Sequence, residues 1–175
     1  SIIGDTLSHV ALAGVALGMI TNVYPLYTAI LFTVIAAIVI EYLREKYENY
    51  AELSLSIVLS AGVGLASVLT SLGNTQGILS YLFGSLSLVS NKEIILVTAL
   101  GIIILATILI LYKKLFYMTF DEESAYLSGI PVKAINLYFS ILVAVTIAIS
   151  MRIVGILLIS SLMILPVAAS LIIAN

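Results

Sequence analysis

The sequence lacks cysteine, has a single histidine and carries very little charge. Without cysteine, disulfide bonds, thiolate metal sites and thiol nucleophiles are excluded. Only 9% of the 175 residues are charged, against roughly a quarter in an ordinary soluble domain. The net charge of -2 and the lack of a basic cluster give no indication of a nucleic-acid partner. One histidine and no cysteine also argue against a membrane-embedded hydrolase or a multi-ligand enzyme site.

Long apolar runs dominate what is present, since 62% of the residues are hydrophobic. A run of about 20 apolar residues is long enough to cross the hydrocarbon core of a bilayer as a helix. Stretches such as IILVTALGIIILATILILY show no alternation of apolar and polar residues, which excludes a transmembrane barrel. The sequence therefore predicts an all-α, polytopic transmembrane helical bundle. We expect residues 1–175 to form a single transmembrane domain that is truncated at both ends.

Polar and turn-forming stretches divide the chain into about six spanning helices. TNVYP and GNTQG are the clearest breaks inside the charge-free regions. The predicted spans are Leu7–Ile20, Leu26–Leu43, Leu53 to the GNTQG stretch, Glu93–Tyr112, Ala134–Ser150 and Ile153–Ile173. The remaining segment, Ile78–Ser90, reaches only about 20 Å as a helix. We expect it not to span, and to be either re-entrant or surface-lying.

The distribution of cations supports a non-spanning segment. Without a crossing there, one side of the membrane receives Arg44, Lys46, Lys113, Lys114 and Lys133, and the other receives Lys92 and Arg152. A crossing would divide the same cations almost evenly. Because cytoplasmic loops are enriched in Lys and Arg, the first arrangement is favoured, with both charged loops in the cytoplasm. Arg152 then lies at the outer end of two spans, where a structural role in the turn is expected.

The second charged loop, FDEESAYLSGIPVK, has the signals of a short helix. A capping aspartate, two acidic residues, a glycine stop and a proline follow in order at Asp121, Glu122 and Glu123, Gly129 and Pro131. Tyr126 and Ile130 lie one turn apart. The helix is predicted either to dock another protein or to lie solvated at the membrane interface.

Four motifs resemble one family. The Ala125-x-x-x-Gly129 pattern with its preceding acidic residues resembles the coupling segment of membrane subunits of ATP-binding-cassette importers. GDTLSHVALAGVALG resembles the signature region of the zinc, manganese and iron permeases among them. SYLFGSLSLVS and MRIVGILLISSLMILPVAAS resemble two further segments of that branch. Because the motifs occur in the order of the family and cover essentially the whole chain, the sequence resembles a membrane permease subunit of this importer family.

The resemblance implies a transport subunit and not an enzyme, located in the cytoplasmic membrane as a multi-pass protein. It implies a second copy of the chain, a cytoplasmic ATPase subunit, an extracellular metal-binding protein and the lipid bilayer as partners. The cargo would be a zinc, manganese or iron ion, with no permanently bound cofactor. No Gly-x-x-x-x-Gly-Lys loop is present, so ATP hydrolysis is expected on the separate subunit. Its expected contacts are Asp121, Glu122, Glu123, Ala125, Tyr126, Gly129, Ile130 and Pro131.

Asp5 and His9 are the candidate metal ligands. Residues four apart lie on one helix face, so an oxygen and a nitrogen can reach one ion. Two ligands are too few for a closed zinc site, which takes about four, and the resemblance implies a second pair from a partner copy. Mixed carboxylate and imidazole ligands suit Mn(II), Fe(II) or Zn(II).

Other interpretations of these residues and of the whole chain remain. Asp5 can act as the N-cap of the first helix, and His9 can be a hydrogen-bonded packing residue. The alternative function is the permease of a related siderophore or cobalamin importer. That branch shares the coupling loop and needs no Asp and His pair.

Overall fold

The computed structural model describes residues 2–47, 50–73, 77–84 and 91–173, and within these ranges all regular structure is helical. The helices in chain order are α1 (Ile2–Thr21), α2 (Pro25–Lys46), α3 (Ala51–Leu72), α4 (Ile78–Phe83), α5 (Asn91–Phe120), α6 (Glu122–Leu127), α7 (Val132–Val154) and α8 (Ile156–Ile173). The predicted all-α class is confirmed.

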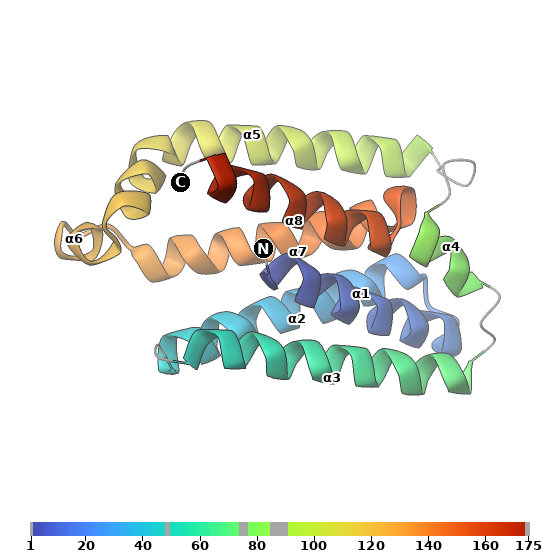
Figure 1. Ribbon diagram of the computed structural model, residues 1–175. Coiled ribbons are helices and arrows are strands. Elements are labelled where there is room, and N and C mark those ends of the chain that lie inside the picture. The colour runs from blue at the N-terminus through green and yellow to red at the C-terminus, as the bar shows by residue number, and fades with distance from the viewer. Residues whose placement is uncertain (1, 48–49, 74–76, 85–90, 174–175) are drawn as a thin grey trace.

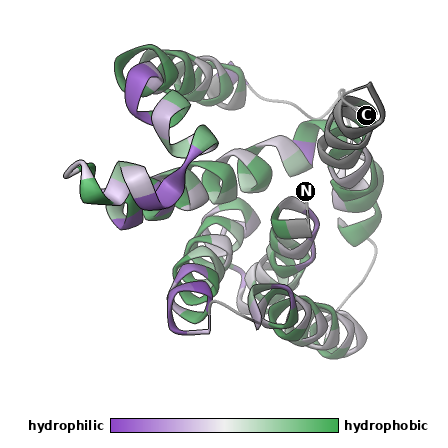
Figure 2. Ribbon diagram, turned by 60° about the vertical axis from the view of Figure 1, so that its left-hand side comes forward, coloured by the Kyte–Doolittle hydropathy of each residue, from purple (hydrophilic) through white to green (hydrophobic). Residues whose placement is uncertain are grey.

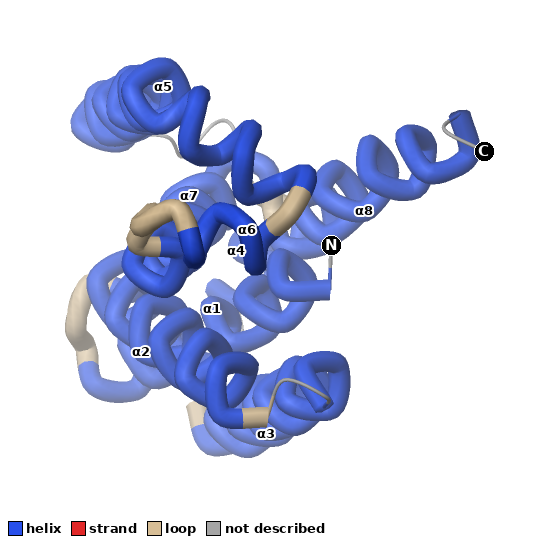
Figure 3. The backbone as a smooth tube through the Cα atoms, turned by 90° about the vertical axis from the view of Figure 1, so that its left-hand side faces the viewer, coloured by secondary structure: helices blue, strands red, loops and turns tan. Residues whose placement is uncertain are grey.

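The long helices lie side by side along one axis (Figure 1). Viewed down that axis, α1 lies inside the group, with α2, α3, α7 and α8 around it, and α5 lies at the margin (Figure 3). Among the described residues, α1, α2, α3, α5 and α7 are long and apolar enough to cross a membrane. The sixth predicted span corresponds to α8, which contains 18 residues and no charged one.

Helices α1 and α5 extend furthest beyond the ends that the sequence predicted. The first is already helical at Ile2, five residues before the predicted start at Leu7. Asp5 therefore lies inside α1 and is not its N-cap. Helix α5 runs to Phe120 and not only to Tyr112, because Leu115, Phe116 and Met118 continue the apolar content of the helix past its paired lysines.

The junction between the last two spans was placed three residues too early. It was predicted at Met151 and Arg152, but α7 continues to Val154 and the break falls at Gly155. Gly155 has a φ of 86°, a left-handed conformation that glycine adopts without steric cost. A Cβ there would lie 2.5 Å from the backbone nitrogen of Gly84, whose φ is 72°. This backbone contact joins the end of α4 to the turn between α7 and α8.

Helix α4 does not cross the bundle, as predicted. It has only six residues, and the helices before and after it, α3 and α5, meet it at the same end of the bundle (Figure 1). It packs against α1, α7 and α8 there. We call this the α4 end and the opposite one the α6 end. The rest of the predicted segment, residues 85–90, lies outside the described residues.

Polar residues gather toward the α6 end, where α2 and α5 end and α7 begins (Figure 2). Arg152 lies at the opposite end, in the last turn of α7. Its guanidinium donates a hydrogen bond to the Tyr24 hydroxyl and lies 5.6 Å from the centroid of the Tyr24 ring. Because Tyr24 precedes α2, this contact ties α7 to the turn between α1 and α2 and agrees with the structural role expected for Arg152.

Glycines allow the close contacts of α1. A Cβ on Gly14 would lie 2.7 Å from both the Ala29 Cα and the Thr28 carbonyl oxygen in α2. A Cβ on Gly62 of α3 would lie 2.7 Å from a Val10 methyl of α1. Small residues at helix contacts let backbones approach this closely. By contrast, a Cβ on Gly64 would meet nothing within 4 Å, so only part of the glycine pattern serves packing.

We predict that Gly14→Ala destabilises the protein by about 1–3 kcal/mol, because the added methyl would press on the backbone of α2. Gly64→Ala is the matched control, since its methyl enters open space and alanine favours the helix by roughly 0.5–1 kcal/mol. Thermal unfolding of the purified full-length protein in detergent measures both. Equal midpoints for the two variants would contradict the close α1 and α2 contact.

Candidate metal site and coupling segment

One strip of α1 stays uncovered. Thr6, Leu7 and Ser8 are fully buried, whereas the side chains of Asp5 and His9 are 30% and 35% exposed. Figure 3 shows α3 and α8 diverging on either side of α1. The fold therefore buries α1 on most sides and leaves the two candidate ligands accessible on a shared face.

The Asp5 and His9 side chains point toward each other. The Asp5 Oδ1 and His9 Nε2 atoms lie 3.7 Å apart, longer than a hydrogen bond and close enough for both to reach one ion. In the part of the chain that the structure describes, no group of three potential His, Cys, Asp or Glu ligands gathers. The two side chains are thus an accessible pair, and the partial exposure of His9 places it outside the buried core.

A cavity of about 480 Å³ opens beside His9. His9 and Leu12 form its wall on α1, and residues from α3 and α4 form the rest: Val63, Ala66, Ser67, Thr70, Ile78, Leu79 and Leu82. Ser67 and Thr70 bring hydroxyl groups to an otherwise apolar lining. The sequence interpretation missed them, although hydroxyls one turn apart on an apolar span were a visible signal.

The predicted short helix in the second charged loop is confirmed as α6. Asp121 is its N-cap and accepts a hydrogen bond of 3.0 Å from the Ser124 backbone amide. Hydrogen bonds from the Ser124 side chain and amide lower the pKa of Asp121. Gly129 has a φ of 80°. The backbone amide of Gly129 donates a hydrogen bond to the Tyr126 carbonyl, and that of Ile130 donates to the Ala125 carbonyl, which closes the helix in a Schellman motif. Pro131 follows as the N-cap of α7.

The apolar residues in and just after α6 differ in their exposure. Tyr126 is 61% exposed, as a docking residue requires, but Ile130 is half-buried. Leu127, which the sequence interpretation did not select, is 79% exposed, while Ala125 is fully buried. Because one helix turn is only about 3.6 residues, adjacent residues at the end of a short helix can both face outward. Tyr126 and Leu127 are therefore the most exposed apolar side chains of α6.

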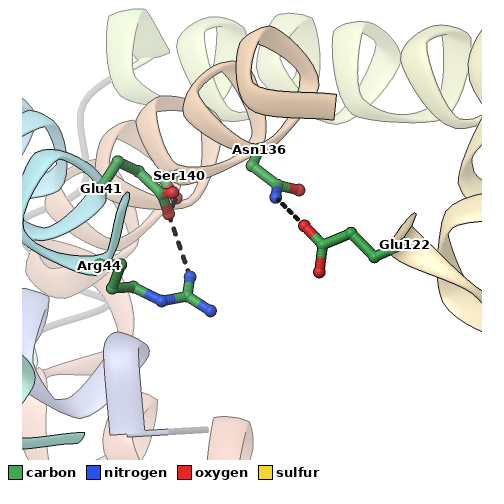
Figure 4. A network of polar contacts seen from close by, with 5 residues as sticks. All are labelled: Glu41, Arg44, Glu122, Asn136 and Ser140. Carbon is green, nitrogen blue, oxygen red and sulfur yellow. Dashed lines mark hydrogen bonds and ion pairs between the residues drawn. The ribbon is translucent and has the colours of Figure 1, made fainter. Parts of the chain in front are cut away.

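Polar contacts at the α6 end were also missed. The Glu41 carboxylate accepts hydrogen bonds from Arg44 and from the Ser140 hydroxyl, and Glu122 accepts one from Asn136 (Figure 4). All five residues line a cavity of about 700 Å³ between α1, α2, α5, α6, α7 and α8. The sequence feature that could have indicated these contacts is the spacing of Asn136 and Ser140, two polar residues one turn apart at the start of an apolar helix.

The sequence matches a known protein family over its whole length. The match is to the ABC 3 transport family, across residues 1–175. A probable metal transport system membrane protein of Treponema pallidum is 41% identical over 172 residues, which are 98% of this chain and 65% of that protein. The high-affinity zinc uptake system membrane protein ZnuB of Haemophilus influenzae is 36% identical, over 95% of this chain and 65% of that protein.

Two further similarities add a manganese transporter and a solved structure. The manganese import system permease protein ScaB of Streptococcus parasanguinis is 28% identical over 100% of this chain and 63% of its own length. PsaBC from Streptococcus pneumoniae, solved in complex with Fab, superposes with a TM-score of 0.71 at 30% identity, covering 90% of this chain and 57% of that one. The chain thus spans between 57% and 65% of the length of these similar proteins.

The capping geometry predicts that α6 depends on the side-chain oxygen of Asp121. Asp121→Ala should speed amide hydrogen exchange across residues 121–131, whereas Asp121→Asn, which keeps an acceptor for the Ser124 amide, should exchange nearly as slowly as the unmodified protein. Because its hydrogen bonds lower the pKa of Asp121, the ionised cap should persist at neutral pH and be lost only as acid titrates the carboxylate. Hydrogen exchange with mass spectrometry measures this, and equal rates for both variants would contradict the cap.

Proposed function

Because this chain belongs to the ABC 3 transport family, we propose that it is the permease subunit of an ATP-driven importer for zinc or manganese. The names of the similar proteins support these two metals. Iron also suits carboxylate and imidazole ligands, but these relatives are named for zinc or manganese. The exposed Asp5 and His9 pair favours this function over the siderophore or cobalamin alternative, whose cargo needs no such ligands.

The transported ion would bind between two copies of the chain. Each copy offers Asp5 and His9 on the uncovered strip of α1, and two copies facing each other would supply about the four ligands that a zinc ion takes. The start of α1 lies partway along the bundle, not level with the start of α7 (Figure 1). A charged residue at the centre of a spanning helix costs on the order of 2.5–3.5 kcal/mol to insert, so ionisable residues away from the ends of a bundle suit an ion path.

Energy would come from a separate cytoplasmic ATPase that docks on α6. The exposed Tyr126 and Leu127 offer apolar contact area, and the acidic first turn offers Glu123, while Glu122 binds Asn136 of α7. Closure of the ATPase pair would displace α6 and switch the two permeases between outward and inward openings. An extracellular metal-binding protein would deliver the ion to this cytoplasmic-membrane complex. The protein itself would hold no permanent cofactor.

A conservative change of either ligand should abolish uptake. We predict that Asp5→Asn or His9→Gln, in the full-length complex in proteoliposomes, lowers zinc or manganese uptake by at least about tenfold. Losing one metal–ligand bond should weaken metal binding by more than about 1.4 kcal/mol, and this energy corresponds to a factor of ten in affinity. Glu52→Gln is the matched control, because Glu52 is an exposed acid in the first turn of α3. Uptake of radiolabelled metal measures the effect, and normal uptake by the Asp5 and His9 variants would rule out the site.

The shared site also predicts a stoichiometry. Metal analysis of the purified complex should give one ion for every two permease chains, because each chain holds only half of the ligands. His9→Gln should remove that ion without changing the mass of the complex on light scattering. One ion per chain would show that each copy binds metal by itself.

A further inference from the structure

The contacts of α6 raise the question of how its displacement reaches the candidate ligands on α1. Helix α6 packs against α5 and α7, and it stands away from the bundle at one end (Figure 1). Helix α1, by contrast, packs most extensively against α2 and α3. A connection between α6 and α1 has to pass through another helix, and α7 contacts α6, α2 and α1.

A side-chain hydrogen bond fixes α6 to α7. The Asn136 Nδ2 donates to the Glu122 Oε1 over 3.1 Å. Figure 4 shows the Asn136 amide and the Glu122 carboxylate directed toward each other from the two helices. Glu122 is the first residue of α6 and Asn136 lies in the second turn of α7. The bond therefore spans the loop at Gly129 and holds the start of one helix on the side of the other.

A second set of polar contacts fixes α7 to α2. The Ser140 hydroxyl, one turn beyond Asn136, donates to the Glu41 carboxylate, and Lys133 forms an ion pair with Glu45. Ser140 is buried, and only 15% of the Glu41 side chain is exposed. Arg44 holds the same Glu41 oxygen from within α2 at 3.2 Å. Because the Lys133 and Glu45 side chains are exposed, their ion pair contributes little, and the buried bond of Ser140 to Glu41 is the main polar contact between α7 and α2.

The last step leads from α2 to α1. At Gly14 the two backbones are close enough that a Cβ would lie 2.7 Å from the Ala29 Cα. Close-packed interiors deform little and pass displacements on. Movement of α2 is therefore expected to move α1 with it.

We propose that Glu122, Asn136, Ser140 and Glu41 form a polar relay that transmits the movement of α6 through α7 and α2 to the ligands on α1. Asn136 is a positioning residue in this relay, because it touches no metal and acts by tying α6 to α7. This inference rests on the proposed transport function and adds the path of coupling within the chain. Its consequence is that breaking the Asn136 bond leaves ATP hydrolysis and metal binding in place but separates them.

The test is a donor and acceptor swap, measured as metal transported per ATP hydrolysed by the full-length complex with its ATPase in proteoliposomes. Asn136→Asp opposes two carboxylates and should lower this ratio by about two- to thirtyfold, the range expected for a residue on a coupling path. Adding Glu122→Gln should restore the ratio, because the introduced amide can donate to the introduced carboxylate. ATP hydrolysis, metal stoichiometry and the thermal midpoint should stay near those of the unmodified complex.

Thr119→Val is the matched control. Thr119 lines the same cavity, but its hydroxyl donates to the Leu115 carbonyl of its own helix, so the transport ratio should be unchanged. If Asn136→Asp fails to assemble, Asn136→Leu removes the bond without adding charge and should lower the ratio in the same way.

Distinct results separate this inference from the proposed function. An unchanged ratio in Asn136→Asp or Asn136→Leu, or a double variant that is not restored, would overturn the relay. A control variant that loses coupling equally would also overturn it, because any polar change in the cavity would then suffice. If the unmodified complex moves neither zinc nor manganese, the proposed function fails.

Discussion

The close packing of α1 against its neighbours is the contact on which the rest of the structure depends. A helix in a bilayer satisfies its own backbone, but nothing in lipid drives apolar helices together as water does, so association relies on close contact. Gly14 and Gly62 supply that contact with α2 and α3. They place a mostly buried helix at the centre of the bundle and fix which of its faces stays open.

That open face decides the chemistry that the chain can offer. If α1 were covered all round, Asp5 and His9 would be out of reach of any ligand. Left on an uncovered strip, with a cavity beside His9, they present an oxygen and a nitrogen to whatever faces them. Under the proposed function each chain would supply half of the ligands, and a symmetric pair of chains would complete the site.

Helix α7 connects the two ends of the molecule. At the α6 end it carries Asn136 and Ser140, which contact α6 and α2. At the α4 end Arg152 holds the turn between α1 and α2, and Gly155 contacts Gly84 at the end of α4. One continuous helix thus contacts α6, α2, α1 and α4. Under the proposed function these contacts would let α7 couple the two ends of the bundle.

The sequence by itself determined the spans, the non-spanning segment, the capped α6 helix and the family, because apolar run length, capping residues and motifs are local properties. Its errors at Leu7, Tyr112 and Arg152 were errors of helix ends, where a few residues can continue or break a helix with little local difference. The tertiary structure alone decided which face of α1 is open, that Leu127 and not Ile130 is exposed, and that Glu41 meets Ser140. These depend on contacts between residues far apart in the chain, which no local pattern specifies.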